Sequence, residues 1–574
     1  MPTGPTADAY RRCKQAEEIS LSFVKPFFDK AIRYYKLFRG GQLPDEWDVT
    51  FSKAFLYLAF SYVWDILPKI VGHVFSQPKF FSMEPQDREL EFFVRDAERW
   101  LYSQVYDRMN MPHSLISTLQ SMAIFGNGYQ YVGSILHKDE RKRKAAAGSV
   151  LGFDYGEMER VESRKEWRII SQPVDFFQLL PAPNGGLINP MDKEWEGAVP
   201  WVIRVNHISR KRLEDWGQRG FAGVNKDHLG KLFETKGDDT TTVDEEYHNQ
   251  MAVDRGEEGN QSFWLTRFGE TKSMGAWYPV EQFFFRDREI WLANDRFVIY
   301  DAPPEHEDGT FPFAKYGDTP DLNNWFDMGW IEVVEDLILA IGLKFGLELD
   351  YLANIMFPTR FVSAQVRRAN PDIDNFGPAP NKEIEVPYGV DPRQAIWYDR
   401  FPDISPQNFM EDAKLEKYLE AALGNPSVGN IMAAGQVREA ATSTMALLEQ
   451  TQGRIGMRGQ NIEEGGLRDQ LHLILLNGAE HQADDVWVRS ADQDSPFWWT
   501  MIDSDAISGR YRIRLHGTRN MVSKQNALSR LLNALPLLLQ DPHMDPIKLR
   551  REALRRMEIF EEPDELLAQQ APQA

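Results

Sequence analysis

The sequence predicts an α+β protein of several domains, and three observations lead to this class. Aromatic and β-branched runs recur between Trp167 and Tyr300, which is typical of β-strands. The stretch 330–356 is strongly apolar, and as one helix it would span about 40 Å at 1.5 Å rise per residue. A glycine-rich stretch, 424–436, joins a shorter amphipathic helix to a very long one that ends near Asn477.

The composition is that of a large folded protein. The chain has 574 residues and a mass of 66.3 kDa, with 42% hydrophobic and 12% aromatic residues, enough for a sizeable core. The single cysteine, Cys13, excludes a disulfide framework within the chain and a multi-cysteine zinc site, so we expect a buried or incidental thiol. The N-terminus lacks a basic region followed by an apolar core, and the apolar run 55–66 is too short to span a bilayer. We therefore expect neither secretion nor membrane insertion.

The net charge bears on partners. At −21, the chain lacks the excess of Lys and Arg with which proteins neutralise the phosphates of duplex DNA, so we expect no tight grip on DNA. An acidic channel wall would instead repel a sliding polyanion and keep it from sticking. The alternative is that the charge only keeps a large assembly dispersed.

The N-terminal part is predicted to be helical up to an Asn-Gly turn at Asn127, after which an aromatic strand follows. A β-rich section comes next, interrupted by a short helix at 209–216 and by the polar, acidic segment 236–261, where we expect an exposed or mobile loop. The predicted helices are 8–36, 49–75, 88–108 and 112–123, and the predicted strands are 167–170, 176–180, 201–205, 283–285 and 296–300.

The long apolar helix 330–356 carries one polar stripe. Glu332, Asp336, Lys344 and Glu348 follow an i, i+4 row, so the rest of the helix needs neighbours on nearly every other side, in a monomer core or a ring of subunits. A small β module follows, bounded by prolines. Its predicted strands are 360–363, 383–386 and 395–398, and later in the chain we predict a helix at 411–423, strands near 498–499 and 511–515, helices at 524–540 and 546–556, and a disordered tail at 569–574.

The residues give little support for catalysis. His472 and His481 are nine apart, which does not place two ligands on one helix face, and neither a Gly-x-Ser-x-Gly elbow nor a phosphate-binding glycine loop occurs. Asp318 and Asp321, like Asp484 and Asp485, are more typical of solvated turns or helix caps than of a cation site. The basic run 138–144 is interrupted by acids and lacks aromatics, so we expect an exposed hairpin tip. We therefore expect no enzyme activity, cofactor or metal.

The order of these parts resembles the portal proteins of tailed double-stranded DNA bacteriophages. The resemblance is concentrated in 312–329, with its Phe-Pro-Phe and Trp-Phe-Asp-Met-Gly stretches, and in 423–466, where the glycine-rich loop leads into the long helix. By this resemblance the fold is a portal-like subunit that assembles as a ring. Its parts would be a wing at 1–327 and 437–521, stem helices at 328–355 and 405–423, a small β clip at 356–404, a tunnel loop at 424–436, and an α-helical crown with the C-terminal tail at 522–574.

The resemblance implies a structural function at one capsid vertex of a virion assembled in the host cytoplasm. A dodecameric head-tail connector ring would admit DNA during packaging, release it during ejection, and contact the large terminase, the major capsid and scaffolding proteins, and later head-tail adaptor or tail proteins. DNA would pass transiently through the channel, and the membrane would play no part. The residues assigned to these roles are Val428, Gly429, Asn430, Ile431 and Met432 in the tunnel loop, Glu332, Asp336 and Glu348 facing the channel, and Arg360, Arg367 and Arg368 for motor or adaptor contact.

Two alternatives from other classes stay open at this point. One is a metal-dependent nuclease that uses carboxylates scattered along the chain. The other is a virion shell or baseplate protein. A purified ring with a central hole would distinguish the portal interpretation from both.

Overall fold

A computed structural model gives the fold, which is mixed helix and sheet as the α+β class requires. The chain divides into two compact units, one of residues 1–35, 61–333 and 428–574 and the other of residues 36–60 and 334–427. The structure describes residues 5–40, 57–75, 80–144, 159–183, 186–190, 197–219, 223–234, 277–321, 324–356, 360–369, 456–481, 486–489 and 499–516, with short pieces within 149–154, 247–251, 391–398 and 414–422. No helix in these ranges is long and apolar enough to cross a bilayer.

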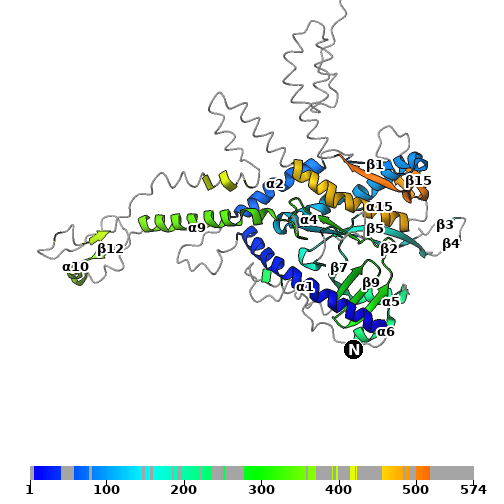
Figure 1. Ribbon diagram of the computed structural model, residues 1–574, viewed down its shortest axis with the longest axis horizontal. Helices are drawn as coiled ribbons and strands as arrows, with labels where there is room; N and C mark the ends of the chain where they lie inside the picture. The colour runs from blue at the N-terminus through cyan, green and yellow to red at the C-terminus, as the bar shows by residue number, and fades with distance from the viewer. Residues whose placement is uncertain are drawn as a thin grey trace, which may run out of the picture. The chain divides into compact units, whose positions relative to one another are not determined.

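The first unit is built around a five-stranded antiparallel sheet in the order β10-β9-β8-β7-β6 (Figure 1). One face packs on helix α1 (Pro5–Phe38), which buries Cys13 and Phe28 against the phenylalanines of β8. The other face meets α5 (Arg210–Arg219) and α6 (Lys226–Glu234) through a second apolar cluster that includes Leu213 and Leu229. The strands are β6 (Leu179–Pro181), β7 (Trp201–Ser209), β8 (Trp277–Phe285), β9 (Glu289–Ala293) and β10 (Phe297–Ala302).

A second sheet carries the long hairpin of β2 (Gly128–Lys144) and β5 (Glu159–Val174), with β11 (Phe313–Tyr316) on the other side of β2. The predicted aromatic strand is confirmed as the start of β2, but the change of direction after α4 lies at Gly126, whose φ is +93°, and not at the predicted Asn127-Gly128 turn. The basic run 138–144 belongs to the paired strand, opposite residues 159–165, and a further small pair, β3 (Ser149–Val150) with β4 (Phe153–Asp154), lies beyond it. The expectation that this run forms the hairpin tip is therefore corrected: its backbone is used in the ladder.

Helices cover the second sheet and join it to the last strands. Residues 456–481 are helical, with a π-helical turn η5 (Glu463–Leu467) before α15 (Arg468–His481), and this stretch ends four residues beyond the predicted Asn477. The side chain of Tyr316 donates to Gln470 of α15. The other helices and strands of this unit are α2 (Leu58–Val74), η1 (Arg88–Phe92), α3 (Val94–Tyr102), η2 (Ser103–Arg108), α4 (Met111–Phe125), α16 (Ser504–Ile507), and the antiparallel pairs β1 (Phe81–Pro85) with β16 (Tyr511–Leu515) and β14 (Val486–Arg489) with β15 (Trp499–Ile502).

The second unit contains most of α9 (Trp330–Met356), whose two ends match the prediction. After α9, β12 (Arg360–Val362) pairs antiparallel with β13 (Ile396–Tyr398), although 33 residues separate the two strands in the sequence. We call residues 360–398 the hairpin module. α10 (Ala364–Ala369) follows β12 directly and buries Val366. The predicted strands 360–363 and 395–398 are confirmed, whereas 383–386 lies outside the described residues.

Two local expectations are wrong. Residues 176–180 are not one strand, because Phe176–Gln178 forms a 3₁₀ turn (η3) capped by the Asp175 carboxylate, which accepts from the backbone N–H of Phe177. Tyr247 and Met251, in the segment expected to be exposed, are buried. The Tyr247 ring stacks on Phe177 and its hydroxyl donates to the carboxylate of Asp29 over 3.0 Å. The aromatic core of the first unit thus extends into a segment whose composition is polar.

Candidate functional site

The three residues assigned to a channel face lie on α9, as predicted from their spacing. Asp336 is exposed, and Glu332 and Glu348 are half-buried. The same helix also exposes large apolar side chains. Exposed large apolar side chains are Val333, Phe345, Leu347, Leu349, Leu352, Ile355 and Met356. Four of them, at 345, 349, 352 and 356, follow i, i+4, i+7 spacing and form one continuous stripe, which we call the α9 stripe.

The clip residues occupy the hairpin module. Arg360 lies in β12, with its backbone paired to Tyr398, and Arg367 and Arg368 are exposed in the last turn of α10. The tunnel-loop residues Val428 to Met432 and the crown lie outside the described residues, and so does the first part of the predicted long helix, up to residue 455. The assignments for those segments stay predictions.

A buried polar cluster surrounds the start of α9. Asp318 is 3% exposed and accepts a 2.6 Å hydrogen bond from the Trp330 indole, while the Arg458 guanidinium lies 3.5 Å away and Asn461 donates to the Asp318 carbonyl. Burial raises the pKa of Asp318, and Arg458 opposes that rise. The expectation of a solvated turn is wrong for Asp318. Its carboxylate ties the first turn of α9 to the helix at 456–481.

The neighbouring cluster fixes the segment before α9. Lys315 is largely buried, and its ammonium contacts Asp327 over 3.1 Å and the Trp325 carbonyl. Burial lowers the pKa of Lys315 and raises that of Asp327, because each charge is costly away from water, and their pairing opposes both shifts. The amide oxygen of Asn127 accepts the backbone N–H of Asp327 over 3.0 Å. Asn127 and the Trp-Phe-Asp stretch at 325–327, which are far apart in the sequence, are therefore hydrogen-bonded, and these contacts fix the segment that leads into α9.

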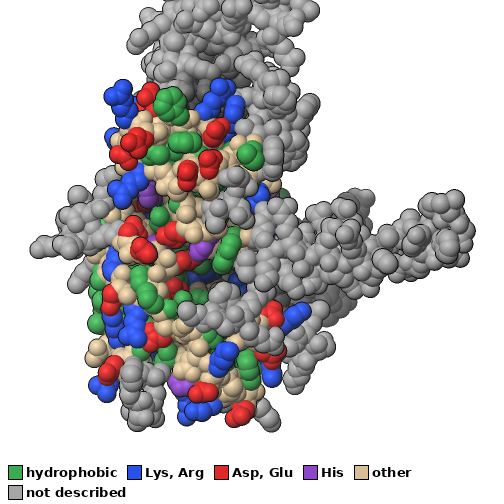
Figure 2. Space-filling model, turned by 90° about the vertical axis from the view of Figure 1, so that its right-hand side faces the viewer, with side chains coloured by type: hydrophobic (Ala, Val, Ile, Leu, Met, Phe, Trp, Pro, Cys, Tyr) green, Lys and Arg blue, Asp and Glu red, His purple; other side chains and the backbone are tan. Residues whose placement is uncertain are grey.

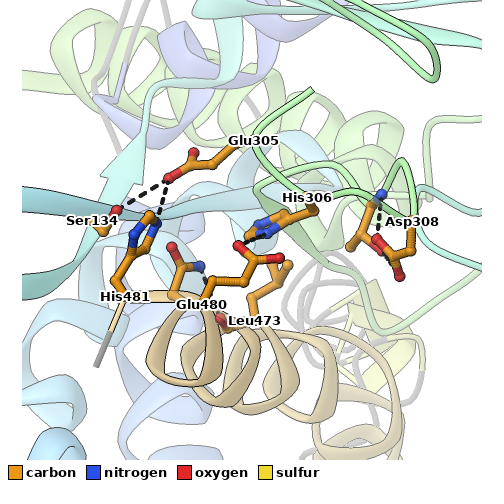
Figure 3. A network of polar contacts seen from close by, with 9 residues as sticks. Ser134, Glu305, His306, Asp308, Leu473, Glu480 and His481 are labelled. Atoms are coloured by element: carbon orange, nitrogen blue, oxygen red, sulfur yellow. Dashed lines mark hydrogen bonds and ion pairs between the residues drawn. The ribbon is translucent and has the colours of Figure 1, made fainter. Parts of the chain in front are cut away.

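Two histidine–glutamate pairs join the 303–312 loop to the end of α15 (Figure 3). His306 Nδ1 lies 2.8 Å from Glu480 Oε2, and His481 Nε2 lies 3.4 Å from Glu305 Oε1, so the two Glu-His dipeptides pair crosswise. The second contact is long for a hydrogen bond. Although burial alone would raise the pKa of Glu305, His481 and His306 hold it below its ordinary value. The sequence contains a Glu-His dipeptide at 305–306 and another at 480–481, but it does not show that the two face each other.

This arrangement does not have the geometry of a nucleophilic triad. Ser134 donates to Glu305 Oε1 over 3.1 Å, so the carboxylate lies between the serine and His481, and among the described residues no imidazole is placed to take the serine proton. Elsewhere, the one group of three possible metal ligands found among the described residues is Glu17, Glu281 and Asp295. The Lys14 ammonium already contacts Glu17 and Asp295. An internal cation therefore offsets part of the negative charge of that group.

Comparison with known proteins adds no family to this geometry: no protein-family model matches the chain, and no curated protein matches it either.

Proposed function

We propose that this protein is the subunit of a portal ring, the channel through which double-stranded DNA enters and leaves a phage capsid. The observation that carries the proposal is the α9 stripe. Phe345, Leu349, Leu352 and Met356 are 38%, 38%, 49% and 74% exposed on one side of a 27-residue helix. Exposed apolar patches of this kind mark interfaces, since burying them stabilises by roughly 25 cal/mol per Å².

A second copy of the chain is the occupant that we assign to this stripe. A helix that is apolar on one side and carries Glu332 and Asp336 on another can pack against the same helix of neighbours while these two acids face an axial space. Glu348, one turn before Leu352, would lie at the border of the stripe. A head-to-tail contact of this kind closes into a ring when the rotation between copies divides a full turn. Acidic side chains around the opening would repel the phosphates of DNA and keep it from adhering.

The hairpin module supports the assignment of a clip. β13 pairs with β12, so the chain returns to the place where the module begins. Arg367 and Arg368 of α10 are exposed. Two adjacent exposed guanidinium groups suit an acidic protein partner, because arginine pairs with carboxylates in bidentate geometry. The large terminase and later the adaptor or tail proteins are the partners proposed for this module. Replacing Arg367 and Arg368 together by serine should weaken motor binding without changing the mass of the ring.

Measurement of the assembly tests the function directly. Native mass spectrometry and negative-stain images of the purified protein should show one closed oligomer of identical subunits with a central hole, and twelve subunits are expected. A stable monomer at micromolar concentration would overturn the proposal. Closed shells or plates without a central hole would instead select the capsid or baseplate alternative, and metal-dependent cleavage of DNA by a monomer would select the nuclease.

A further inference from the structure

An arginine within the five-stranded sheet is buried without a counter-charge. Arg204 of β7, the strand beside the central β8, is 9% exposed, and its guanidinium lies over the Tyr131 ring, 4.4 Å from the ring centre. Its Nε is buried and has no hydrogen-bond partner, and within the described part of the chain no carboxylate pairs with it. Burial lowers the pKa of Arg204, yet arginine stays charged at neutral pH. An uncompensated buried charge is costly, so this position requires an explanation.

The groups around Arg204 make the site more positive and leave a second polar atom unused. Gln282 of β8 is the direct cross-strand partner of Arg204, and its buried Oε1 accepts no hydrogen bond. Arg212 of α5 lies near enough to lower the pKa of Arg204 further by repulsion. The site therefore offers N–H donors with positive charge beside one acceptor that lacks a donor.

Two carboxylates near Tyr131, those of Glu289 and Glu305, do not serve as counter-ions. Glu289 accepts from the Trp291 indole over 2.7 Å, and burial raises its pKa to about 8, so it is mostly protonated at neutral pH. Glu305 is ionised but is engaged by His481 and Ser134. Within the described residues, Arg204 therefore has no carboxylate counter-ion, and an external anion could supply the negative charge.

The site also has an access side. Arg212 is exposed in α5, and its guanidinium lies over the ring of Trp216, which packs against Trp291. Basic, acidic and apolar side chains are interspersed over the face of the molecule shown in the space-filling view (Figure 2). A small anion would approach the donors of Arg204 from the side of the exposed Arg212.

We propose that Arg204, Gln282 and Arg212, above the Tyr131 ring, bind a phosphate group that carries a hydroxyl, either inorganic hydrogen phosphate or the monoanion that a phosphomonoester forms below its second pKa of about 6. The oxyanion accepts from the two guanidinium groups, and the phosphate O–H donates to Gln282 Oε1. A carboxylate and a phosphodiester both lack that O–H and leave Gln282 unsatisfied, so DNA backbone is not the ligand of this site.

Thermal unfolding of the full chain in phosphate-free buffer, with and without inorganic phosphate, tests the site. Phosphate should raise the Tm of the wild type, and Trp216 and Trp291 fluorescence should titrate over the same concentrations. Arg204→Met should abolish both responses and should raise the Tm in the absence of phosphate, because it removes an unpaired buried charge. Arg510→Met, at an exposed arginine elsewhere in the unit, is the matched control and should respond like the wild type.

Further arms decide the ligand class and guard against misfolding. Acetate and dimethyl phosphate should leave the Tm unchanged, and a response to glycerol phosphate alone would identify a phosphomonoester. Gln282→Leu, which keeps both arginines, should weaken phosphate binding about tenfold, the value of one buried hydrogen bond, and it carries the test if Arg204→Met does not fold. A wild type insensitive to phosphate, an undiminished response in Arg204→Met, or an equal response to acetate would each overturn the proposal.

Discussion

Ionisable side chains inside the first unit avoid the cost of an unpaired charge in different ways. Arg286 is compensated by backbone, since its guanidinium donates to the carbonyls of Ile188, Val199 and Gly309 and lies 3.8 Å from the centre of the Phe311 ring. Burial still lowers the pKa of Arg286 to about 10. Glu289 is compensated by protonation instead. Which solution a side chain adopts depends on the partners that the fold brings within hydrogen-bond distance.

The protonation of Glu289 predicts a pH dependence of stability. Burial raises its pKa from 4.5 to about 8, so between these values the folded state holds a proton that the unfolded state has lost. Stability contributed by this proton is fully present below about pH 4.5 and is lost as pH rises through 8, at up to about 1.4 kcal/mol per pH unit. Glu289→Gln keeps an acceptor for Trp291 and has no proton to lose. Its urea midpoint should therefore increasingly exceed that of the wild type as pH rises.

Glu307→Gln is the control for this experiment, because Glu307 is an exposed carboxylate two residues from Glu305. Its stability should follow the wild-type curve across the same pH range. Parallel curves for Glu289→Gln and the wild type would show that Glu289 is ionised in the folded protein. In that case the ionised Glu289 could serve as the counter-ion of Arg204.

At the scale of elements, the helix at 456–481 packs closely on β11 through one glycine. A Cβ at Gly466 would lie 2.5 Å from the Tyr316 ring, whereas a Cβ at the adjacent Gly465 would have no atom within 4 Å. Gly466→Ala should therefore destabilise the protein by about 1–3 kcal/mol through overpacking. Gly465→Ala should be neutral or stabilising by up to about 1 kcal/mol, since alanine favours helix. Equal urea midpoints for the two variants would contradict the packing.

The α9 stripe makes a second prediction at this scale. Leu349→Asp combined with Leu352→Asp places two charges at positions 38% and 49% exposed in the single chain, so the subunit should fold while the ring dissociates. Mass photometry should show the loss of the large oligomer, and circular dichroism should be unchanged. Asn354→Asp adds a charge half a turn away from the stripe and should preserve the ring. Dissociation of both variants would show general repulsion instead of a specific interface.

For the whole molecule, the proposed ring places the glycine-rich loop 424–436 in the channel. The loop has no Lys or Arg with which to grip phosphate, and in the proposed ring Ile431 and Met432 would present apolar side chains to a passing strand. Ile431→Asp with Met432→Asp should leave the ring intact and lower the packaging or retention of DNA, measured as the filled fraction of capsids. Ser427→Asp, which adds one charge just before Val428 to Met432, is the control and should lower the filled fraction less than the double variant. Normal filling by the double variant would reduce the loop to a connection between helices.

The sequence alone determined the elements whose pattern lies within one segment. Both ends of α9, the start of β7, the last residues of β8, the aromatic strand after Asn127 and the strands of the hairpin module follow from local periodicity, because it depends on neighbouring residues. The channel-facing assignment of Glu332, Asp336 and Glu348 came from their spacing and stays a prediction. These features required no knowledge of distant partners.

Only the tertiary structure decided which distant residues meet. Asp318 is buried because Trp330 and Arg458 reach it, and Tyr247 is buried because the aromatic core extends to it, so composition misjudged both. The Glu-His pairs join residues 174 and 176 positions apart, and nothing in either dipeptide specifies the other. Arg204 could not be recognised from sequence either, since an arginine in a strand is ordinary until its cross-strand neighbour and its lack of a carboxylate are known. Whether a residue is buried and which residue it pairs with depend on what lies near it in space, and the neighbouring sequence does not specify this.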